Sequence, residues 1–218
     1  YRVDDNTNRA VNAGELLLVD SGGQYLDGTT DITRTIAVGA VGADEKACYT
    51  RVLQGMIAIS RVRFPKGARG SELDALARYP LWLAGQDYDH GTGHGVGAYL
   101  CVHEGPQGIS RKATTKLETG MILSNEPGYY REGAFGIRIE NLIVVRDAAP
   151  IDGGDARRMM EFETLTFVPL DRALIDVTLL SNDERAWIDA YHSDTFSKIS
   201  GRVDGVALDW LTAACAPL

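Results

Sequence analysis

The sequence predicts a fold that mixes helices with strands, of the α/β or α+β class. Residues 31–38 alternate polar and apolar side chains as a half-buried strand does, whereas residues 44–64 place apolar side chains near helical spacing. The length of 218 residues and the hydrophobic content of 44% are sufficient for a sizeable core. No shift in composition marks a linker, so the elements are expected to belong to one large domain or two small ones.

Strand and helix patterns alternate along the chain. Runs of strand-forming residues bounded by turn residues predict strands over residues 15–19, 31–38, 121–126, 135–145 and 161–168. Helical spacing and helix-start signals predict helices over residues 44–64, from 71 onward, 182–197 and 203–215. Asp27-Gly28 supplies the first turn, Asp44 is the expected helix cap, and the glycine-rich residues 90–97 are expected to form a loop. The last helix is expected to present one apolar face, made of Val203, Val206, Ala207, Trp210 and Leu211.

Composition excludes several classes of partner. The formal charge is −8 and the sequence has no block of lysine or arginine, which argues against nucleic acid. No apolar run approaches the ~18 residues that cross a bilayer. The three cysteines are odd in number and widely spaced, which argues against a disulfide framework, so we expect a cytoplasmic protein. Because the chain starts at Tyr1 without an initiator Met or a signal-peptide pattern, we expect it to be part of a longer polypeptide.

Five potential metal ligands follow one another along the chain, each in a local sequence that can direct it to a common point. They are Asp20, Asp31, His94, Glu126 and Glu140. Four carboxylates carry a charge of about −4, which is costly to bury alone and which two divalent ions would cancel. The residues therefore predict a dinuclear metallohydrolase.

The first two of these ligands belong to the predicted hairpin. Side chains alternate between the faces of a strand, and a tight turn brings two strands within ~5 Å, so Asp20 and Asp31 can share one face. Two carboxylates placed in this way repel each other unless positive charge lies between them. A solvated hairpin with turn-forming aspartates is the alternative interpretation.

The two glutamates lie at predicted strands. Within residues 136–141 the period of two places Arg138 and Glu140 on one face, although a half-exposed sheet would show the same pattern. Glu126 precedes a Pro-Gly pair, which is expected to end its strand and to leave the carboxylate at a sheet edge or cleft rim. Alone, a glutamate before a turn would be unremarkable.

Three of the four histidines, His90, His94 and His103, fall within fourteen residues. The spacing of His90 and His94 mimics the helical pair of zinc peptidases, but no glutamate follows His90 and the glycines would not hold a helix. A glycine-rich loop instead lets the backbone approach a ligand closely. A core histidine satisfied by hydrogen bonds is the usual explanation for a single histidine, and it fits three gathered histidines less well.

The motifs, taken in order, carry a family resemblance that runs nearly end to end. They are residues 20–35, residues 90–97 with 103–106, residues 125–130 and residues 136–141. Together they closely resemble aminopeptidase P of the pita-bread metallopeptidases, and most of all its large three-domain cytosolic form. The resemblance implies a curved antiparallel sheet covered by helices. Residues 1–218 would be most of one catalytic domain that lacks its opening segment, with a carboxy-terminal helical extension over about 170–218.

The resemblance also implies a distribution of metal ligands. Asp20 and Asp31 would hold one ion, and Asp31, His94, Glu126 and Glu140 would reach the other. In this arrangement Asp31 and Glu140 bridge the two ions. Oxygen donors with one imidazole suit Mn²⁺, with Zn²⁺ and Co²⁺ as alternatives, and the absence of thiolate ligands removes the usual preference for structural zinc.

Further residues would act on the substrate. His90 and His103 resemble histidines that hold substrate and assist proton movement, Arg138 resembles an arginine that steadies the carboxylates, and Tyr130 resembles a supporting hydroxyl. The implied reaction is hydrolysis of the amino-terminal Xaa-Pro bond by a water that bridges the metals, with Glu126 taking its proton. The expected partners are peptides with proline at the second position, and a homodimer is compatible with this interpretation.

Three alternatives remain open at this point. Prolidase, which cuts only Xaa-Pro dipeptides, would use the same kind of metal-binding residues. A non-catalytic pita-bread module that binds peptides or proteins would not require all five ligands. A cysteine hydrolase that used Cys101 with His103 would lack an orienting third group nearby.

One departure from the family concerns the start of the chain. The family has a further active-site histidine about twenty residues before the first metal aspartate, and that position would precede Tyr1. We therefore expect an apolar face to be uncovered and this chain alone to be poorly active.

Overall fold

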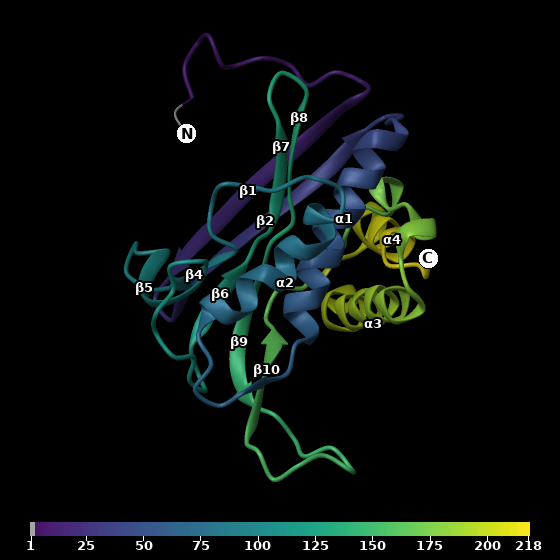
Figure 1. Cartoon of the computed structure of the whole chain (residues 1–218). Coiled ribbons are helices and arrows are strands. Elements are labelled where there is room, and N and C mark those ends of the chain that lie inside the picture. Colours follow the sequence, from purple (N-terminus) through teal and green to yellow (C-terminus); the bar gives the residue numbers. More distant parts are fainter. Residues whose placement is uncertain (1–2) are drawn as a thin grey trace.

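The computed structural model describes residues 3–218, which form four α-helices and antiparallel strands in three sheets (Figure 1). The strands are β1 (Glu15–Tyr25), β2 (Gly28–Val38), β3 (Phe64–Pro65), β4 (Gly93–Val96), β5 (His103–Ile109), β6 (Ile122–Asn125), β7 (Gly128–Arg131), β8 (Phe135–Arg138), β9 (Asn141–Asp147) and β10 (Met159–Thr164). The α-helices are α1 (Ala43–Arg61), α2 (Gly70–Trp82), α3 (Asn182–Ile199) and α4 (Gly205–Ala214). The predicted mixture of helices with a curved antiparallel sheet is confirmed.

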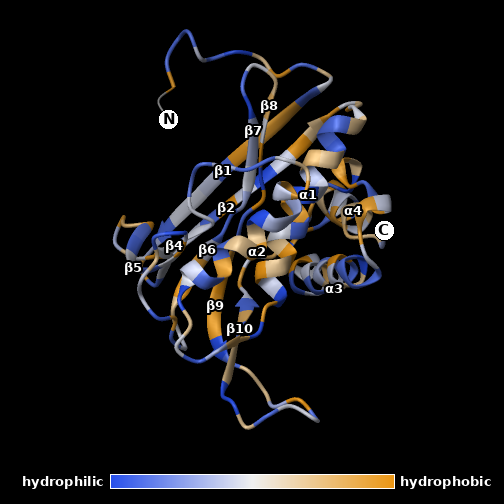
Figure 2. Ribbon diagram, viewed as in Figure 1, coloured by the Kyte–Doolittle hydropathy of each residue, from blue (hydrophilic) through white to orange (hydrophobic). Residues whose placement is uncertain are grey.

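The largest sheet has the strand order β3-β10-β9-β6-β4-β5, and the hairpins β1-β2 and β7-β8 form two smaller sheets. Helices α1 and α2 pack together against these strands, and α3 and α4 lie to the right of α1 in the view of Figure 1, where α3 contacts both α1 and α4. Two groups of buried apolar side chains fill the space between these layers, and the orange stretches of β9 and of the helices mark them in Figure 2. Among the described helices, none is both long and apolar enough to cross a bilayer.

The first hairpin is longer than predicted. Strand β1 continues past Asp20 to Tyr25, and the turn consists of Leu26 and Asp27 rather than Asp27 and Gly28. Pairing persists because Gly22 lies so close to β2 that a Cβ atom there would be 2.5 Å from the Thr30 carbonyl oxygen. Gly22 therefore permits close contact between the two strands.

The first helix begins and ends earlier than predicted. Its N-cap is Gly42, so Asp44 lies in the first turn, where a carboxylate complements the positive end of the helix. The helix ends at Arg61 rather than near residue 64. Phe64 instead enters strand β3 and packs its ring 5.1 Å from that of Phe162. Burial of this aromatic side chain against the sheet outweighs continuation of the helix.

The predicted loop over residues 90–97 is wrong in its second half, where strand β4 runs between β5 and β6. A Cβ atom on Gly93 would lie 1.9 Å from the Ser124 carbonyl oxygen, and one on Gly95 would lie 2.1 Å from that of Glu104. The glycines therefore permit the close packing of three strands. As a result His94 projects from a sheet and not from a flexible loop.

The predicted strand over residues 135–145 is in fact two strands in different sheets. The first part, β8, pairs with β7, and the second part, β9, pairs with β6 and β10. Strand β7 was not predicted, because it follows directly on the Pro-Gly pair that was expected to end a strand. The break falls at residues 139–140, where the Glu140 N–H donates to the Thr33 carbonyl at 3.0 Å. Tertiary contact with β2 thus interrupts a continuous strand pattern. The side-chain alternation survives, because Ile137 and Ile139 are both fully buried.

The carboxy-terminal part follows the prediction in its two helices and differs in two details. Strand β10 ends at Thr164 rather than near residue 168, and the chain then leaves the sheet. On α4, Leu211 is buried, but Val206 is 85% and Trp210 60% exposed. The expected apolar face is therefore not buried within the described residues.

Candidate metal centre

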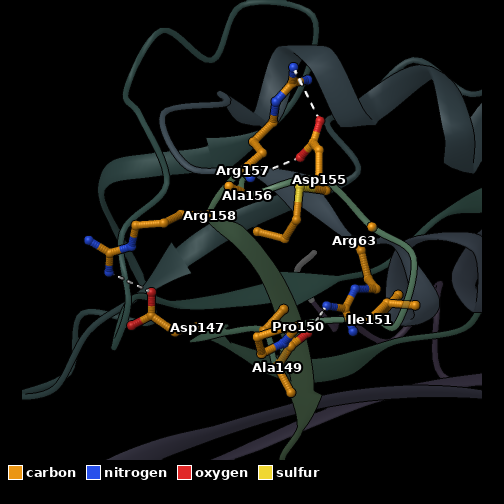
Figure 3. Close-up of a pocket in the computed structure, with 12 residues that line it drawn as sticks. Arg63, Asp147, Ala149, Pro150, Ile151, Asp155, Ala156, Arg157 and Arg158 are labelled. Atoms are coloured by element: carbon orange, nitrogen blue, oxygen red, sulfur yellow. Dashed lines mark hydrogen bonds and ion pairs between the residues drawn. The ribbon is translucent and has the colours of Figure 1, made fainter.

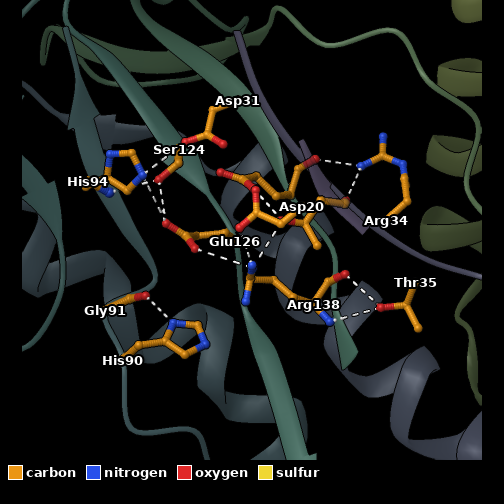
Figure 4. Close-up of polar contacts among 12 residues, drawn as sticks. Asp20, Asp31, Arg34, Thr35, His90, Gly91, His94, Ser124, Glu126 and Arg138 are labelled. Atoms are coloured by element: carbon orange, nitrogen blue, oxygen red, sulfur yellow. Dashed lines mark hydrogen bonds and ion pairs between the residues drawn. The ribbon is translucent and has the colours of Figure 1, made fainter. Parts of the chain in front are cut away.

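The five predicted ligands come together in one cleft of about 520 Å³ (Figure 4). Asp20 and Asp31 project from the first hairpin, His94 from β4, Glu126 from the segment after β6, and Glu140 from the junction before β9. The cleft is also lined by His90, His103 and Arg138. Side chains that span more than a hundred residues of sequence therefore share one solvent-accessible space.

The hairpin places its two aspartates on the same face, diagonally across the strands. Asp20 lies opposite Thr33, and Asp31 lies opposite Gly22, two positions further along β1. Because the side-chain period of a strand is two, this offset keeps both carboxylates on the cleft side. The alternation of side chains along a strand was enough to predict that both aspartates lie on one face. Their diagonal offset depends on the observed turn at Leu26 and Asp27.

Asp31, His94 and Glu140 are the tightest group, because one ligand atom from each lies within 4.8 Å of the other two. The Nδ1 of His94 is 2.9 Å from the Gly95 carbonyl oxygen, which can only accept a hydrogen bond. This contact makes Nδ1 a donor, so in the neutral form of His94 the lone pair of Nε2 faces the cleft. His94 Nε2 lies 3.4 Å from Asp31 and from Glu126.

Asp20 and Glu126 complete the group through different contacts. Arg138 Nη2 donates to Asp20 Oδ2 at 2.5 Å, and Arg138 Nε lies 3.8 Å from Glu126 Oε2. Ser124 Oγ donates to Glu126 Oε1 at 2.9 Å and accepts from the His94 backbone N–H at 2.9 Å. Arg138 therefore supplies positive charge to the carboxylates, and Ser124 ties Glu126 to the strand that carries His94.

The ionisation of the cluster shows how unfavourable its bare charges are. Burial, together with repulsion from Glu126 and Asp31, raises the pKa of Glu140 to about 8. Burial also raises the pKa of Glu126. For His94, burial lowers the pKa, but the hydrogen bond to Asp31 and the charge of Glu126 outweigh it and raise the value to about 8. Without a metal ion, the raised pKa values mean that some of these groups keep their protons, which reduces the repulsion among the carboxylates.

The donor set fits divalent cations. Four carboxylates with one imidazole are typical of Mn²⁺ and related ions, and the Nε2 lone pair of His94 is oriented for coordination. A cation in the cleft would replace the retained protons and remove the repulsion among the carboxylates. The charge, chemistry and spacing of these residues therefore suit a metal centre.

A chain of hydrogen bonds links Arg138 to His90 at the edge of the cleft. Arg138 Nη1 donates to the Tyr130 hydroxyl at 3.1 Å, and that hydroxyl is 2.8 Å from His90 Nε2. His90 Nδ1 is 2.8 Å from the Gly91 carbonyl oxygen and must be the donor, so Nε2 accepts from Tyr130. Burial lowers the pKa of His90, which favours this neutral form.

His103 faces the same cleft from the first position of β5. Its ring meets that of His94 edge-on, with centroids 4.3 Å apart, and His103 pairs with Val96 of β4. The Cys101 thiol donates to the His103 carbonyl oxygen at 3.5 Å and not to the imidazole. This geometry gives no support to a cysteine nucleophile.

Sequence reasoning missed several supporting residues. Thr33 Oγ1 donates to Glu140 Oε2 at 2.6 Å. The buried Arg78 donates to the carbonyl oxygens of Tyr88 at 2.6 Å and His90 at 2.7 Å, so it fixes the segment that carries His90. These residues act through tertiary contacts, and only the proximity of Thr33 to Asp31 in the sequence could have pointed to one of them.

A larger hollow of about 610 Å³ lies at the loop between β9 and β10 (Figure 3). Its arginines bind neighbouring groups within the loop: Arg158 pairs with Asp147 at 3.1 Å, and Arg63 donates to the Ala149 carbonyl. Arg157 lies 3.8 Å from Asp155. The charges of this hollow are thus already paired, and the cleft of Figure 4 is the better candidate site.

Comparison with known proteins places the chain among metallopeptidases. Residues 1–147 match the model of metallopeptidase family M24, and residues 158–218 match the model of the C-terminal region of peptidase M24. A probable Xaa-Pro aminopeptidase P of Laccaria bicolor is 48% identical over 224 residues, which cover 100% of this chain and 35% of that protein. Aminopeptidase P2 of Arabidopsis thaliana is 49% identical over 221 residues, which cover 100% of this chain and 31% of that protein. The chain thus spans about a third of the length of the curated relatives it matches.

Solved structures agree with this assignment. The X-prolyl aminopeptidase from Caenorhabditis elegans, described as a cytosolic enzyme with a di-nuclear active site, superimposes with a TM-score of 0.92 and 39% identity over 99% of this chain and 36% of that one. The prolidase from Pyrococcus horikoshii gives a TM-score of 0.58 and 36% identity over 62% of this chain and 39% of that one. Because the family model covers residues 1–147, more than half of the sequence, the chain belongs to metallopeptidase family M24.

Proposed function

We propose that the protein containing this chain removes the amino-terminal residue from peptides with proline at the second position, using two divalent metal ions. The observation that carries this proposal is the cleft in which four carboxylates and His94 converge. Relatives named Xaa-Pro aminopeptidase P and a structural neighbour with a di-nuclear active site support it. Because the chain spans about a third of those relatives, the activity is proposed for the whole protein.

In this proposal five residues hold the ions. Asp20 and Asp31 bind one ion, and Asp31, His94, Glu126 and Glu140 reach the other. Mn²⁺ suits this oxygen-rich set best, with Zn²⁺ or Co²⁺ as alternatives. The two ions would supply a water shared between them, with its pKa lowered, and would polarise the scissile carbonyl.

The proton movements are assigned to residues of this chain. Glu126, held by Ser124 and close to Arg138, accepts the proton of the attacking water. The nitrogen of an Xaa-Pro bond belongs to a tertiary amide with no N–H, so it must gain a proton to leave. His103, at the cleft side of His94, is the proposed donor. His90, oriented by Tyr130, holds the substrate beside it.

We also propose that residues 1–218 form most of one catalytic domain, with about 170–218 as its carboxy-terminal helical extension. The match of residues 158–218 to the C-terminal region of peptidase M24 supports this division. A cytoplasmic location is proposed by analogy with the neighbour described as a cytosolic enzyme.

The test is peptide cleavage by Mn²⁺-loaded protein, followed by chromatography with an Xaa-Pro-Xaa tripeptide, an Xaa-Pro dipeptide and an Xaa-Ala-Xaa tripeptide. This chain is compared with a polypeptide extended upstream, because the chain spans only about a third of its relatives' length. Release of the first residue from the proline tripeptide by the extended protein is expected, with low turnover by the chain alone. If the extended protein with bound metal cleaves no proline peptide, the proposal is wrong.

Prolidase activity is the second candidate, because prolidases of known structure also superimpose on this chain. The same assay separates the two activities. Cleavage of the dipeptide without the tripeptide would favour prolidase. We expect the reverse, since the relatives that match the entire chain are named aminopeptidases.

A further inference from the structure

A buried arginine lies directly behind the candidate metal centre. The Arg34 side chain is on β2, and the residue is only 6% exposed. Among residues 3–218 its guanidinium donates only to carbonyl, amide and hydroxyl oxygens: those of Thr33 at 2.9 Å, Glu140 at 2.6 Å, Asn141 at 2.8 Å, Val168 at 2.8 Å, Pro169 at 3.1 Å and Tyr191 at 2.9 Å. Every nitrogen of the guanidinium is therefore used.

This arrangement constrains three segments at once. A buried guanidinium is tolerated only when its donors are satisfied, and its planar fork fixes the directions of its acceptors. Arg34 thereby sets the positions of β2, of the Glu140–Asn141 junction and of residues 168–169 relative to one another. Figure 4 shows Arg34 and His94 on opposite sides of the group of side chains that it draws.

Tyr191 joins helix α3 to the same point. Its hydroxyl accepts from Arg34, lies 2.8 Å from the Val168 carbonyl oxygen and 3.1 Å from that of Thr166. The ring stacks on Trp187 of the same helix, with centroids 5.3 Å apart and planes inclined by 5°. The stacked ring and these hydrogen bonds hold the hydroxyl in place. The position of the Arg34 guanidinium therefore depends on the position of α3.

Glu140 depends on this support because it lies in the break between β8 and β9. Its N–H donates to the Thr33 carbonyl at 3.0 Å, its carbonyl accepts from Arg34, and its carboxylate accepts from the Thr33 hydroxyl. No ladder of strand pairing continues through this position. The location of the carboxylate is thus set by β2 and by Arg34.

We infer that helix α3 positions Glu140 through Tyr191 and Arg34, so that the carboxy-terminal segment sets the affinity of the centre for the ion that Glu140 helps to bind. Tyr191 and Arg34 are positioning residues, since neither reaches the cleft. The inference rests on the proposed metal-binding function and adds a role for a segment distant from the cleft.

The test is Tyr191→Phe, which removes the hydroxyl and keeps the stacked ring. Tyr49→Phe is the matched control, because Tyr49 is a fully buried tyrosine of the same apolar cluster whose hydroxyl makes no hydrogen bond to Arg34 or to any other described residue. Mn²⁺ affinity is measured by calorimetry for this 218-residue chain. The absorption spectrum of the Co²⁺-loaded chain reports the ligand geometry, which a merely structural role would leave unchanged.

We expect Tyr191→Phe to weaken Mn²⁺ binding by about tenfold, the low end of the loss seen when support of a ligand is removed. Its Co²⁺ spectrum should shift, and Tyr49→Phe should match the parent in both measurements. Parent-like binding and spectrum in Tyr191→Phe would overturn the inference, and so would equal losses in the two variants. Should Tyr191→Phe fail to fold, as judged by circular dichroism, Arg34→Lys takes its place and the same results decide.

Failure of the proposed function would look different. In that case the parent chain would bind neither Mn²⁺ nor Co²⁺, and the comparison between the two tyrosine variants would show no binding in either. Binding by the parent that is insensitive to Tyr191→Phe would reject only the role of helix α3.

Discussion

The hydroxyl of Thr33 donates to the carboxylate of Glu140 at 2.6 Å, although 107 residues separate the two in the sequence. Thr33 is fully buried, and its Oγ1 also accepts from Arg138 Nε at 3.1 Å. One hydroxyl therefore orients a proposed bridging ligand and the arginine that steadies the other carboxylates. It acts together with the backbone bond from the Glu140 N–H to the Thr33 carbonyl, at the point where the strand pattern breaks.

Replacement of Thr33 by valine tests this orientation. Thr33→Val keeps the shape of the side chain and removes the hydroxyl, so we expect Mn²⁺ affinity to fall by about tenfold or more. Thr33→Ser, which retains the hydroxyl, should bind nearly as the parent does. Isothermal titration calorimetry measures both. Equal affinity in Thr33→Val and the parent would show that Glu140 needs no such support.

Replacement of His103 separates catalysis from metal binding. His103→Ala should lower turnover on an Xaa-Pro-Xaa peptide by about a hundredfold or more, the usual loss when a proton donor is removed. Metal content should be unchanged, because His103 is not one of the five proposed ligands. Elemental mass spectrometry and a peptide assay on the extended protein measure the two quantities. Loss of metal, with full turnover once metal is restored, would instead identify His103 as a ligand.

The buried His192 predicts a specific dependence of stability on pH. Burial, with a contribution from Arg172, lowers its folded-state pKa to about 4, and its Nε2 accepts from the Leu170 N–H at 3.1 Å. Unfolded histidine has a pKa of about 6.5. The stabilisation from neutral His192 is complete above pH ~6.5 and is lost as the pH falls towards 4, because only the unfolded state binds the proton in that range.

His192→Gln is the control, since the glutamine oxygen can accept from Leu170 and does not titrate. The parent should lose up to about 3 kcal/mol of unfolding free energy between pH 6.5 and 4 that His192→Gln does not lose. Urea unfolding across this range provides the measurement. Parallel pH profiles for the two proteins would show that His192 titrates normally in the folded state.

Gly93 tests the close packing that places His94 on a strand. A Cβ atom at residue 93 would lie 1.9 Å from the Ser124 carbonyl oxygen, so Gly93→Ala must displace β4 or β6. We expect a loss of about 1–3 kcal/mol in unfolding free energy, together with weaker metal binding. Gly201→Ala, where no atom lies within 4 Å of the added Cβ, should leave both quantities unchanged. Similar results for the two variants would contradict the packing argument.

The sequence was most informative where local periodicity decides the outcome. Parity along a strand sufficed to place Asp20 and Asp31 on one face, and it also placed Arg138 beside Glu140 even though the strand between them breaks. The helix patterns gave α3 and α4 within a few residues of their observed ends. These features depend on near neighbours in the chain.

Tertiary contacts decided the features that the sequence did not predict. Gly93 and Gly95 suggested a loop because their need for close strand contact is invisible without β5 and β6. The break at Glu140 follows from its bond to Thr33, and the exposure of Trp210 follows from how α4 packs. The roles of the ligands and of the histidines stay predictions, since they came from a family resemblance.

The most direct test of a dinuclear centre is the titration of this chain with Mn²⁺ by calorimetry, after removal of metal with a chelator. We expect two ions per chain and a higher melting temperature on binding, with about 2.7 kcal/mol of added stability for each site at a free concentration of 100 times Kd. Glu140→Gln should raise the melting temperature of the metal-free chain, because it removes a buried carboxyl group that must bind a proton on folding, and it should reduce the response to Mn²⁺. A parent chain that binds no Mn²⁺, or a Glu140→Gln variant that binds two ions with parent affinity, would contradict the account.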